Sequence, residues 1–416
     1  MNPDSPIRVL HFADTHFGVE IYGRLDPATG TQTRLEDFKR SLMSAIDAAL
    51  AEGIDLAVFA GDAYKGRDPS QTHQRAFAEC LRKLTSAGVP VVLLVGNHDI
   101  PQIRGRATAI EIYRTLGVEL MHVISSPEVI TVDTARGKVQ IAGMPFLVKG
   151  FALAKEDSVG KSPDDVRDMI ESIYATQFDR LAKACDPTLP TICMGHFWVT
   201  TAKLSDWQTG YFNNTEPKVS IELLRKPEFD YVALGHIHKH QDLNPNGYPS
   251  VVYSGSPDCI DFGERDEVKG FVIVQLARNA TTWNFHEIEG RRAFLDIGVN
   301  AISDDPTEDV LAAIRKENIV GSVVRLTIRI AEEALPLLRE NEIRAALADA
   351  RYIAGIRRQV QRTSTSRSRE LTEGLDPMSA LGHYFDQDEK WKSRKPELLE
   401  LAATLVAQLT AEESAR

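Results

Sequence analysis

Seven side chains that bind metal ions well each follow an apolar, strand-like run of this sequence. They are two aspartates, one asparagine and four histidines: Asp14, His16, Asp62, Asn97, His196, His236 and His238. This mixture of carboxylate, amide and imidazole suits Mn, Fe or Zn, and the lack of cysteine among them argues against a thiolate zinc site. One ion takes roughly four to six ligands, so a set of this size is large enough for two ions.

Two such ions have a defined chemistry. Ions about 3.5–4 Å apart share a bridging carboxylate and hold a phosphate between them. They lower the pKa of a shared water towards neutrality, which supplies a nucleophile for in-line attack on phosphorus, and they neutralise the charge on the phosphoryl oxygens. The residues therefore predict hydrolysis of a phosphoester.

Strands must bring these side chains together. The five runs that precede them are Val9–Ala13, Leu56–Ala60, Val91–Val95, Thr191–Met194 and Tyr231–Leu234. Open α/β sheets place their ligand site at the carboxyl ends of the strands, so we expect the five ends to converge.

Helical patterns separate the first three runs. A helix is expected over Arg34–Glu52, with a capping box of Thr33 and Glu36 before it and a C-cap glycine at Gly53. A second is expected near Ser70–Ala87. The β-α-β-α-β order predicts a parallel sheet, and the fold class is α/β, with layered sheets flanked by helices.

The order of the motifs D-x-H, GD, GNHD, GH and GHxH resembles the calcineurin-like metallophosphoesterases. The resemblance implies that one ion is bound by Asp14, His16, Asp62 and His238. It implies that the other is bound by Asp62, Asn97, His196 and His236, with Asp62 as the bridge.

The same resemblance gives roles to the two residues after Asn97. It implies that His98 binds no metal and faces the leaving-group oxygen as a general acid, or orients the phosphate. Asp99 would hold His98 in place. Of the other histidines, we expect His11 to be a packed core residue and His240 to lie in a solvated loop. The remaining four are expected to be structural or at the surface: His73, His122, His286 and His383.

Length and composition limit the possible classes of protein. A chain of 416 residues is long enough for two or three units. Its four cysteines show no paired spacing, and its start lacks the features of a signal peptide, so we expect a soluble, cytoplasmic protein. The net charge of −11 argues against broad attraction to nucleic acid, although a local basic groove remains compatible with it.

The order of the expected strands, helices and linker divides the chain into three parts. The first is a catalytic domain over 1–289, and the second is a small βαβαβ module over 291–362. A linker over 363–376 leads to a tail over 377–416 with two short amphipathic helices, which dock on a partner or on the main body. The module ends in a basic run that is either a solvated strand face or a phosphate-contacting surface: Arg351, Arg357, Arg358 and Arg362.

Further segments resemble the nuclease family that includes the bacterial SbcCD nuclease and the nucleases of double-strand-break repair. They are His11–Gly18, Arg67–Ser70, Tyr253–Pro257 and Phe262–Glu264 followed by Lys269-Gly270. The resemblance, which is to the SbcD component, implies a DNA exonuclease and endonuclease in DNA repair and recombination that uses two divalent ions, with Mn²⁺ favoured over Fe or Zn. It implies a homodimer, a second module that caps the site and touches DNA, and tail helices that bind the coiled-coil base of an SbcC-like ABC-type ATPase.

One position departs from that family. After the bridging aspartate, many of its nucleases have His or Asp three residues on, where this chain has Lys65. Lys65 offers a point charge to a phosphate. The loop over 203–218 carries Trp207, Tyr211 and Phe212, which either stack on unpaired bases or pack the loop onto the body.

Two other functions remain open. The first is a small-molecule phosphodiesterase or phosphatase on the same metal core, which would need neither a capping module nor partner helices. The second is an assembly component in which catalysis is secondary. The complete ligand set argues against the second, because burying so many polar ligands without a metal is costly.

Overall fold

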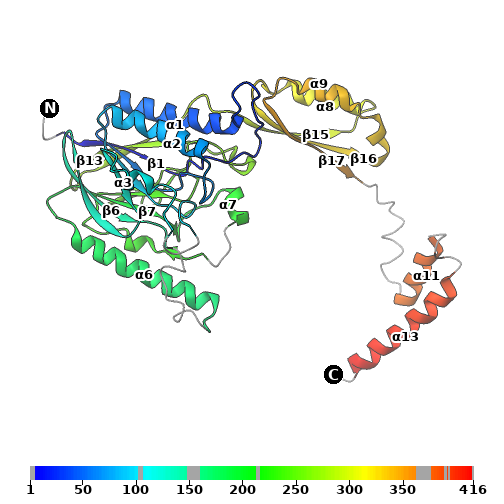
Figure 1. The fold of residues 1–416 in the computed structure, drawn as a ribbon. Coiled ribbons are helices and arrows are strands. Elements are labelled where there is room, and N and C mark those ends of the chain that lie inside the picture. The colour runs from blue at the N-terminus through cyan, green and yellow to red at the C-terminus, as the bar shows by residue number, and fades with distance from the viewer. Residues whose placement is uncertain are drawn as a thin grey trace. The chain divides into compact units, whose positions relative to one another are not determined.

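The computed structural model describes residues 5–101, 106–147, 160–211, 216–361, 376–387, 391 and 394–414. Two six-stranded sheets form its largest part (Figure 1). Residues 363–375 of the expected linker, together with Phe212 and Arg362, lie outside the described residues.

The first sheet carries the first three motifs. In spatial order its strands are β14 (Thr282–Glu287), β13 (Gly270–Leu276), β1 (Ile7–Phe12), β2 (Leu56–Phe59), β3 (Val91–Leu94) and β4 (Met121–Ile124). Strands β1 to β4 run parallel, whereas β13 is antiparallel to both β1 and β14. The expected parallel β-α-β-α-β unit is confirmed.

The second sheet carries the last two motifs. Its order is β11 (Gln241–Asp242), β12 (Ser250–Tyr253), β10 (Tyr231–Gly235), β7 (Thr191–His196), β6 (Gly137–Met144) and β5 (Glu128–Thr134). The strands from β12 to β6 are parallel, and the two edge strands are antiparallel to their neighbours.

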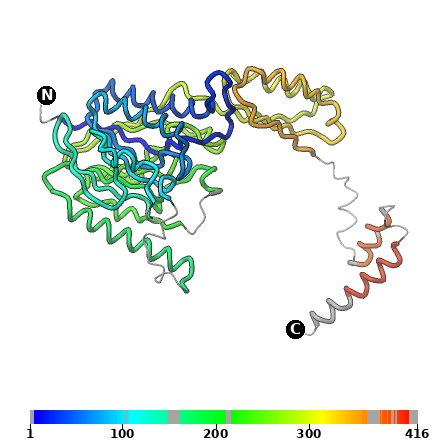
Figure 2. Tube along the Cα trace, in the orientation of Figure 1, coloured from blue at the N-terminus to red at the C-terminus, as the bar shows by residue number. Residues whose placement is uncertain are grey.

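Helices cover the outer faces of the two sheets. Apolar residues of α1 (Thr33–Ala51) and α2 (Gln71–Ser86) share a buried core with the first sheet, and the two helices run side by side (Figure 2). The long helix α6 (Pro163–Ala184) covers the second sheet. A third core of branched aliphatic side chains lies between the sheets, which gives four layers. The predicted fold class is confirmed.

One local prediction on α1 is wrong. The helix starts at Thr33, its N-cap is Gln32, and the cap makes no side-chain hydrogen bond. The Thr33 hydroxyl instead accepts the N–H of Arg24 at 3.1 Å, which takes it away from a capping box. The C-terminal prediction is confirmed, because Gly53 has φ +69° and its N–H binds the Leu50 carbonyl.

A three-stranded sheet follows β14 along the chain. It consists of β15 (Phe294–Ala301), β16 (Val323–Ala331) and β17 (Tyr352–Gln361). Helix α8 (Pro306–Arg315) begins after Asp305, whose carboxylate accepts the N–H groups of Thr307 and Glu308. A 3₁₀ segment at Glu332–Leu337 precedes the short helix α9 (Glu340–Ala346).

The chain divides into two compact units. One comprises Met1–Ile297, Ile314–Leu326 and Ala346–Ile356, and the other comprises Gly298–Ala313, Thr327–Ala345 and Arg357–Arg416. The second unit includes the tail helices α11 (Pro377–Gln387) and α13 (Lys395–Ser414), which pack against each other. The domain boundaries expected from the sequence stay a prediction. Among the described residues, every helix is too short or too polar to cross a lipid bilayer.

Candidate metal centre

The carboxyl ends of five strands meet at one place in the first unit. Three of them, β1, β2 and β3, belong to the first sheet, and β7 and β10 belong to the second. All seven side chains expected to bind metal project into this place. Six of them form overlapping groups, in each of which the donor atoms lie within 4.8 Å of one another, and Asn97 contacts two of these six.

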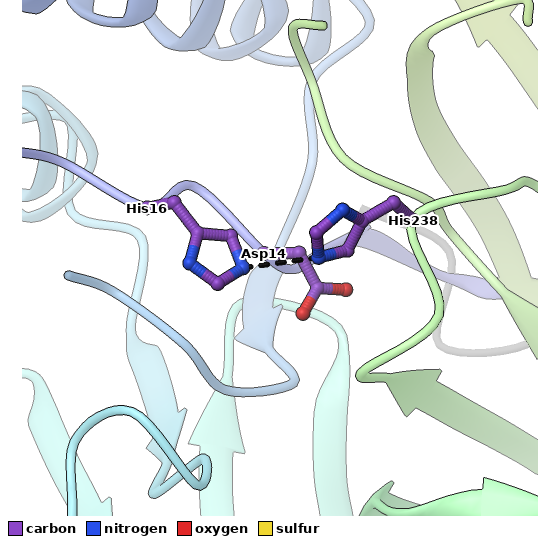
Figure 3. A group of neighbouring side chains, drawn as sticks. All are labelled: Asp14, His16 and His238. Carbon is purple, nitrogen blue, oxygen red and sulfur yellow. Dashed lines mark hydrogen bonds between the residues drawn. The ribbon is translucent and has the colours of Figure 1, made fainter. Parts of the chain in front are cut away.

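The first group is Asp14, His16 and His238. The two imidazoles point toward each other beside the Asp14 carboxylate, with 3.1 Å between their Nε2 atoms (Figure 3). Asp14 is fully buried, and both of its carboxylate oxygens lie 3.0 Å from the backbone nitrogen of His236. Burial raises the pKa of Asp14.

The second group is Asp62, His196 and His236. Asn97 joins it, because its Oδ1 lies 3.0 Å from both His196 Nε2 and His236 Nδ1. Asp62 Oδ2 lies 3.3 Å from His196 Nε2 and 3.7 Å from His16 Nε2. Asp62 therefore lies between the two groups, where a bridging carboxylate would have to be.

The spacing of the donor atoms fits metal ions. Two ligands that are each about 2.1 Å from one ion, at right angles, are about 3 Å apart. The distances of 3.0–3.3 Å between imidazole nitrogens and amide or carboxylate oxygens match that value. The Nε2 atoms of His16 and His238 lie 3.1 Å apart, which is hydrogen-bond distance and also the spacing expected of two ligands of one ion. The donor set thus fits two ions.

Backbone strain marks the same residues. Four of the donors have positive φ: Asp14 at 53°, His16 at 44°, Asp62 at 61° and His236 at 94°. Side-chain-bearing residues rarely adopt these angles, and such strain is found where function requires a fixed geometry. Gly96 permits the close approach of the strands, because a Cβ there would collide with the Asp62 carboxylate.

Three of the imidazoles are fixed by their outward nitrogen atoms. His196 Nδ1 lies 2.7 Å from the Ala60 carbonyl, His236 Nε2 lies 2.6 Å from Glu216 Oε1, and His238 Nδ1 lies 2.7 Å from Glu264 Oε1. Each acceptor keeps a proton on the outward nitrogen and leaves the inward one free to bind a metal. The sequence reasoning missed the roles of Glu216 and Glu264, since neither follows a motif strand directly.

Glu264 belongs to a buried charged network behind His238. The Lys269 ammonium lies 2.8 Å from Glu264 and 2.9 Å from Glu267, and it also donates to the His238 carbonyl at 3.1 Å. Burial raises the pKa of Glu264. Lys269 and His238 lower it by more than burial raises it, so the net pKa is far below its usual value. Glu264 is thus held ionised against His238.

Asp62 and His196 shift each other's pKa. Burial raises the pKa of Asp62, but the neighbouring His196 and His98 outweigh it, so that the net pKa lies well below the usual range. Burial lowers the pKa of His196, whereas the Asp62 carboxylate raises it, and the result is about 9. Asp62 is therefore an anion over the whole range of ordinary pH.

His98 forms a third such group with His16 and Asp62, but it lies at the rim of the cluster. Its side chain is 40 % exposed, and its Nε2 lies 4.0 Å from Asp62 Oδ2. Its Nδ1 lies 2.7 Å from the carbonyl of Lys65, which fixes the ring with Nε2 toward the site. The ring therefore faces the cavity from the rim of the donor cluster.

The expected contact between Asp99 and the His98 ring is wrong. Asp99 is buried, and its carboxylate accepts backbone N–H groups of Asp62, Ala63 and Gly96 at 3.0–3.1 Å. Burial and the charge of Asp62 raise the pKa of Asp99 to about 7. Asp99 shapes the backbone that presents Asp62, and the Lys65 carbonyl fixes the His98 ring instead.

The remaining histidines lie outside the donor groups. His11 is a buried core residue, as expected, between Tyr231 OH and the Leu234 carbonyl. The solvated position expected for His240 is wrong, because its ring stacks on Phe285 at 3.9 Å and its Nδ1 binds the Tyr253 carbonyl. Three others are partly exposed: His73, His122 and His286. The side chain of His383 lies outside the described part of the chain.

Two adjoining cavities open onto the donor cluster. The larger, of about 540 Å³, reaches Asp62, His98 and Trp207, and it has an apolar side. The residues of that side are Val19, Ile21, Phe146, Trp207 and Ile260. The second, of about 520 Å³, runs from His98 past Lys65, Arg67 and Arg106.

The basic run that begins at Arg351, just before β17, and continues along that strand makes its own ion pairs. Arg351 pairs with Asp26 at 3.7 Å, and Arg358 pairs with Glu340 at 2.6 Å. Arg357 is exposed. The two alternatives for this run, a solvated strand face and a phosphate-contacting surface, both stay predictions.

Residues 7–240, more than half of the chain, match the calcineurin-like phosphoesterase family. The chain belongs to that family, as its motifs predicted. Members of the family bind two metal ions, and the donor cluster described above supplies such a site.

The chain is also similar to proteins that are named for DNA repair or for nuclease activity. The chain is 25% identical over 322 residues to the DNA double-strand break repair protein Mre11 of Haloferax volcanii, covering 77% of this chain and 61% of that protein. It is 27% identical over 275 residues to the D component of the nuclease SbcCD of Bacillus subtilis, covering 64% of this chain and 66% of that protein. The chain thus spans less than two thirds of the length of these relatives.

Solved structures are more distant. A dimetal phosphatase from Danio rerio is 9% identical and covers 68% of this chain and 97% of that chain, at a TM-score of 0.39. A likeness at this level carries no functional argument.

Proposed function

We propose that this metallophosphoesterase is a two-metal DNA exonuclease and endonuclease that works in the repair and recombination of DNA. Its relatives are named as a component of a nuclease and as a double-strand break repair protein. The observation that carries the proposal is the second cavity, which leads from His98 along three basic side chains: Lys65, Arg67 and Arg106. A nucleic acid strand has regularly spaced phosphates that such a path would contact.

The donor residues would hold the two ions in two groups. Two divalent ions, when bound, polarise the phosphodiester and supply the nucleophile; we propose Mn²⁺. Asp14, His16 and His238 would hold one ion, and Asn97, His196 and His236 the other. Asp62 would join them.

His98 is proposed as the proton donor to the leaving group. Its backbone N–H binds Asp62 Oδ1 at 2.8 Å, which places the ring beside the cluster. The Lys65 carbonyl fixes Nδ1, so Nε2 faces the cavity. A general acid needs this combination of a fixed ring and access to the substrate.

The test is release of nucleotides from end-labelled linear duplex DNA in the presence of Mn²⁺. Wild-type protein should release nucleotides, and His98→Ala should not. If neither duplex nor single-stranded DNA is cut while a generic diester is hydrolysed, DNA is not the substrate of the isolated chain. Lys65 would then be the first residue to change.

A small-molecule phosphodiesterase is the second candidate. The apolar side of the larger cavity favours it, because a space of about 540 Å³ suits a ligand of nucleotide size. Hydrolysis of small cyclic or linear diesters that is much faster than that of DNA would support this alternative.

Partner and assembly are proposed on the relatives' names, since one of them is part of a larger nuclease. We propose that the tail helices bind an ABC-type ATPase through its coiled coil, that the chain forms a homodimer, and that it acts in the cytoplasm. Tyr384, Leu401 and Leu405 in the tail expose 53–61% of their surface, which offers an apolar face.

Truncation tests the role of the tail. Removal of the chain from Thr363 onward should abolish co-purification with the ATPase and leave hydrolysis of a simple diester intact. Undiminished binding after truncation would remove the proposal.

A further inference from the structure

One buried glutamine contacts the backbone of both histidines in the turn after β10. Gln208 lies in the short helix α7 (Asp206–Tyr211) and is 1% exposed. Its Nε2 donates to the carbonyl of His236 at 2.8 Å, and its Oε1 accepts the N–H of His238 at 3.0 Å. The Ser205 hydroxyl accepts the N–H of Gln208 at 3.2 Å, which fixes the start of the helix.

This contact takes the place of a neighbouring strand. Strand β10 ends at Gly235, so the backbone from His236 to His238 has left the ladder of the sheet. A primary amide presents a donor and an acceptor side by side, as a peptide group on an adjacent strand does. Gln208 therefore pairs with a carbonyl and with an N–H two residues further on, as a strand would.

The two histidines serve different donor groups. His236 lies with Asp62 and His196, whereas His238 lies with Asp14 and His16. His236 also has φ +94°, a conformation that persists only where the surroundings impose it. The distance between the two imidazoles thus depends on what holds this short turn.

The carboxylates behind the two rings act on one ring each. Glu216 lies against His236, and Glu264 lies against His238. The ring of Trp207 stacks on His238 with 5.5 Å between ring centroids. Gln208 differs from these residues, because its amide ties the two positions to each other through hydrogen bonds to both.

We propose that Gln208 is a positioning residue that sets the spacing of His236 and His238 and thereby couples the binding of the two ions. The proposal rests on the two-ion site of the proposed function. It goes beyond that site by assigning a residue outside the five motifs, one whose amide is occupied by the backbone of the two ligand positions. Loss of that amide should loosen both positions together.

The test compares matched variants of the full chain by Mn²⁺ titration calorimetry on metal-free protein. Gln208→Met keeps the length of the side chain and removes both hydrogen bonds. It should weaken binding of both ions by about 10–100-fold, the usual effect of losing a partner that orients a ligand. Glu216→Gln should weaken mainly one ion, and Asp206→Asn, an exposed change on the same helix, should leave both as in wild type.

Electron paramagnetic resonance adds a readout that does not depend on activity. A spin-coupled signal from paired Mn²⁺ should be strong in wild type and reduced in Gln208→Met at equal metal concentration. Thermal unfolding in EDTA checks that the variants fold. If Gln208→Met does not fold, Gln208→Asn, which keeps the amide on a shorter side chain, replaces it and should also weaken both ions.

The outcomes separate the two proposals. Wild-type affinity for both ions in the Gln208 variant, or loss of only one ion, would overturn the role of Gln208. A wild-type protein that fails to bind two ions would overturn the two-metal function itself.

Discussion

The metal-ligand cluster and the arginine run of β17 both present several ionisable side chains, and they are held by different kinds of contact. In the cluster, Asp14 and Asp62 are buried, and backbone N–H groups bind their carboxylates. On β17, Arg358 is 41% exposed and pairs with a surface glutamate. Buried charges need fixed partners, whereas an exposed ion pair contributes only about 0–1 kcal/mol.

The difference shows which positions tolerate change. Removing a buried donor leaves other buried polar groups without a partner, so its effect should spread through the cluster. Removing an exposed arginine frees one acid to be solvated. We therefore expect the effects of substitution to fall steeply from the cluster to β17.

The largest effect is expected at Asp62. Asp62→Ala removes the carboxylate between the two donor groups, and diester hydrolysis should fall toward the uncatalysed rate, a loss on the order of 10⁶-fold. Steady-state rates with a chromogenic diester measure it. Substantial remaining activity would show that the two groups do not act through a shared carboxylate.

At the rim of the cluster, His98→Ala should lower the rate by roughly 10²–10⁴-fold, the usual contribution of a general acid. Metal content should stay at the wild-type level, because the ring lies at the rim and is partly exposed. Rates and metal analysis on the same sample decide this. Loss of metal in His98→Ala would make it a ligand and would contradict its proposed role.

Behind the cluster, Lys269→Met should destabilise the fold by about 3–5 kcal/mol, because the change leaves Glu264 charged and without its buried cation. Lys39→Met is the matched control, because Lys39 pairs with Glu79 at 2.6 Å on the surface and should lose at most about 1 kcal/mol. Denaturant unfolding measures both. Equal losses of stability would mean that the buried ion pair stabilises the fold no more than the surface pair does.

The smallest effects are expected on DNA affinity. Lys65→Ala should reduce the salt dependence of DNA binding by about one unit of slope, since it removes one phosphate contact beside the site. Arg358→Gln should leave the slope unchanged, because Glu340 already neutralises this arginine. Binding titrations at several salt concentrations test both. A larger effect at Arg358 would reverse the order and make β17 a DNA-binding surface.

Sequence reasoning succeeded where a side chain follows directly from a strand. Asp14 and His236 each follow a parallel strand, and this is enough to place them where the carboxyl ends of the strands meet. Local spacing cannot place Gln208, Glu216 and Glu264, because each reaches the cluster from a segment whose path depends on tertiary packing. A buried acid two residues after the start of a 3₁₀ turn, as Glu264 is, gives no periodic signal.

Two errors have the same origin. Thr33 and Glu36 have the spacing of a capping box, but a loop nitrogen from Arg24 uses the hydroxyl. Asp99 stands next to His98 in sequence, yet its carboxylate turns inward to the backbone of the Asp62 turn. In both cases the side chain accepts a hydrogen bond from a backbone N–H that is distant in sequence, and not from the neighbouring group that the local pattern suggested.

Metal stoichiometry of wild type and Asp62→Ala tests the central claim most directly. Each protein is loaded with Mn²⁺, freed of excess ions and analysed by mass spectrometry for metal per chain. The two-metal account predicts two ions in wild type and loss of both in Asp62→Ala. Two ions retained at full occupancy in Asp62→Ala would contradict it.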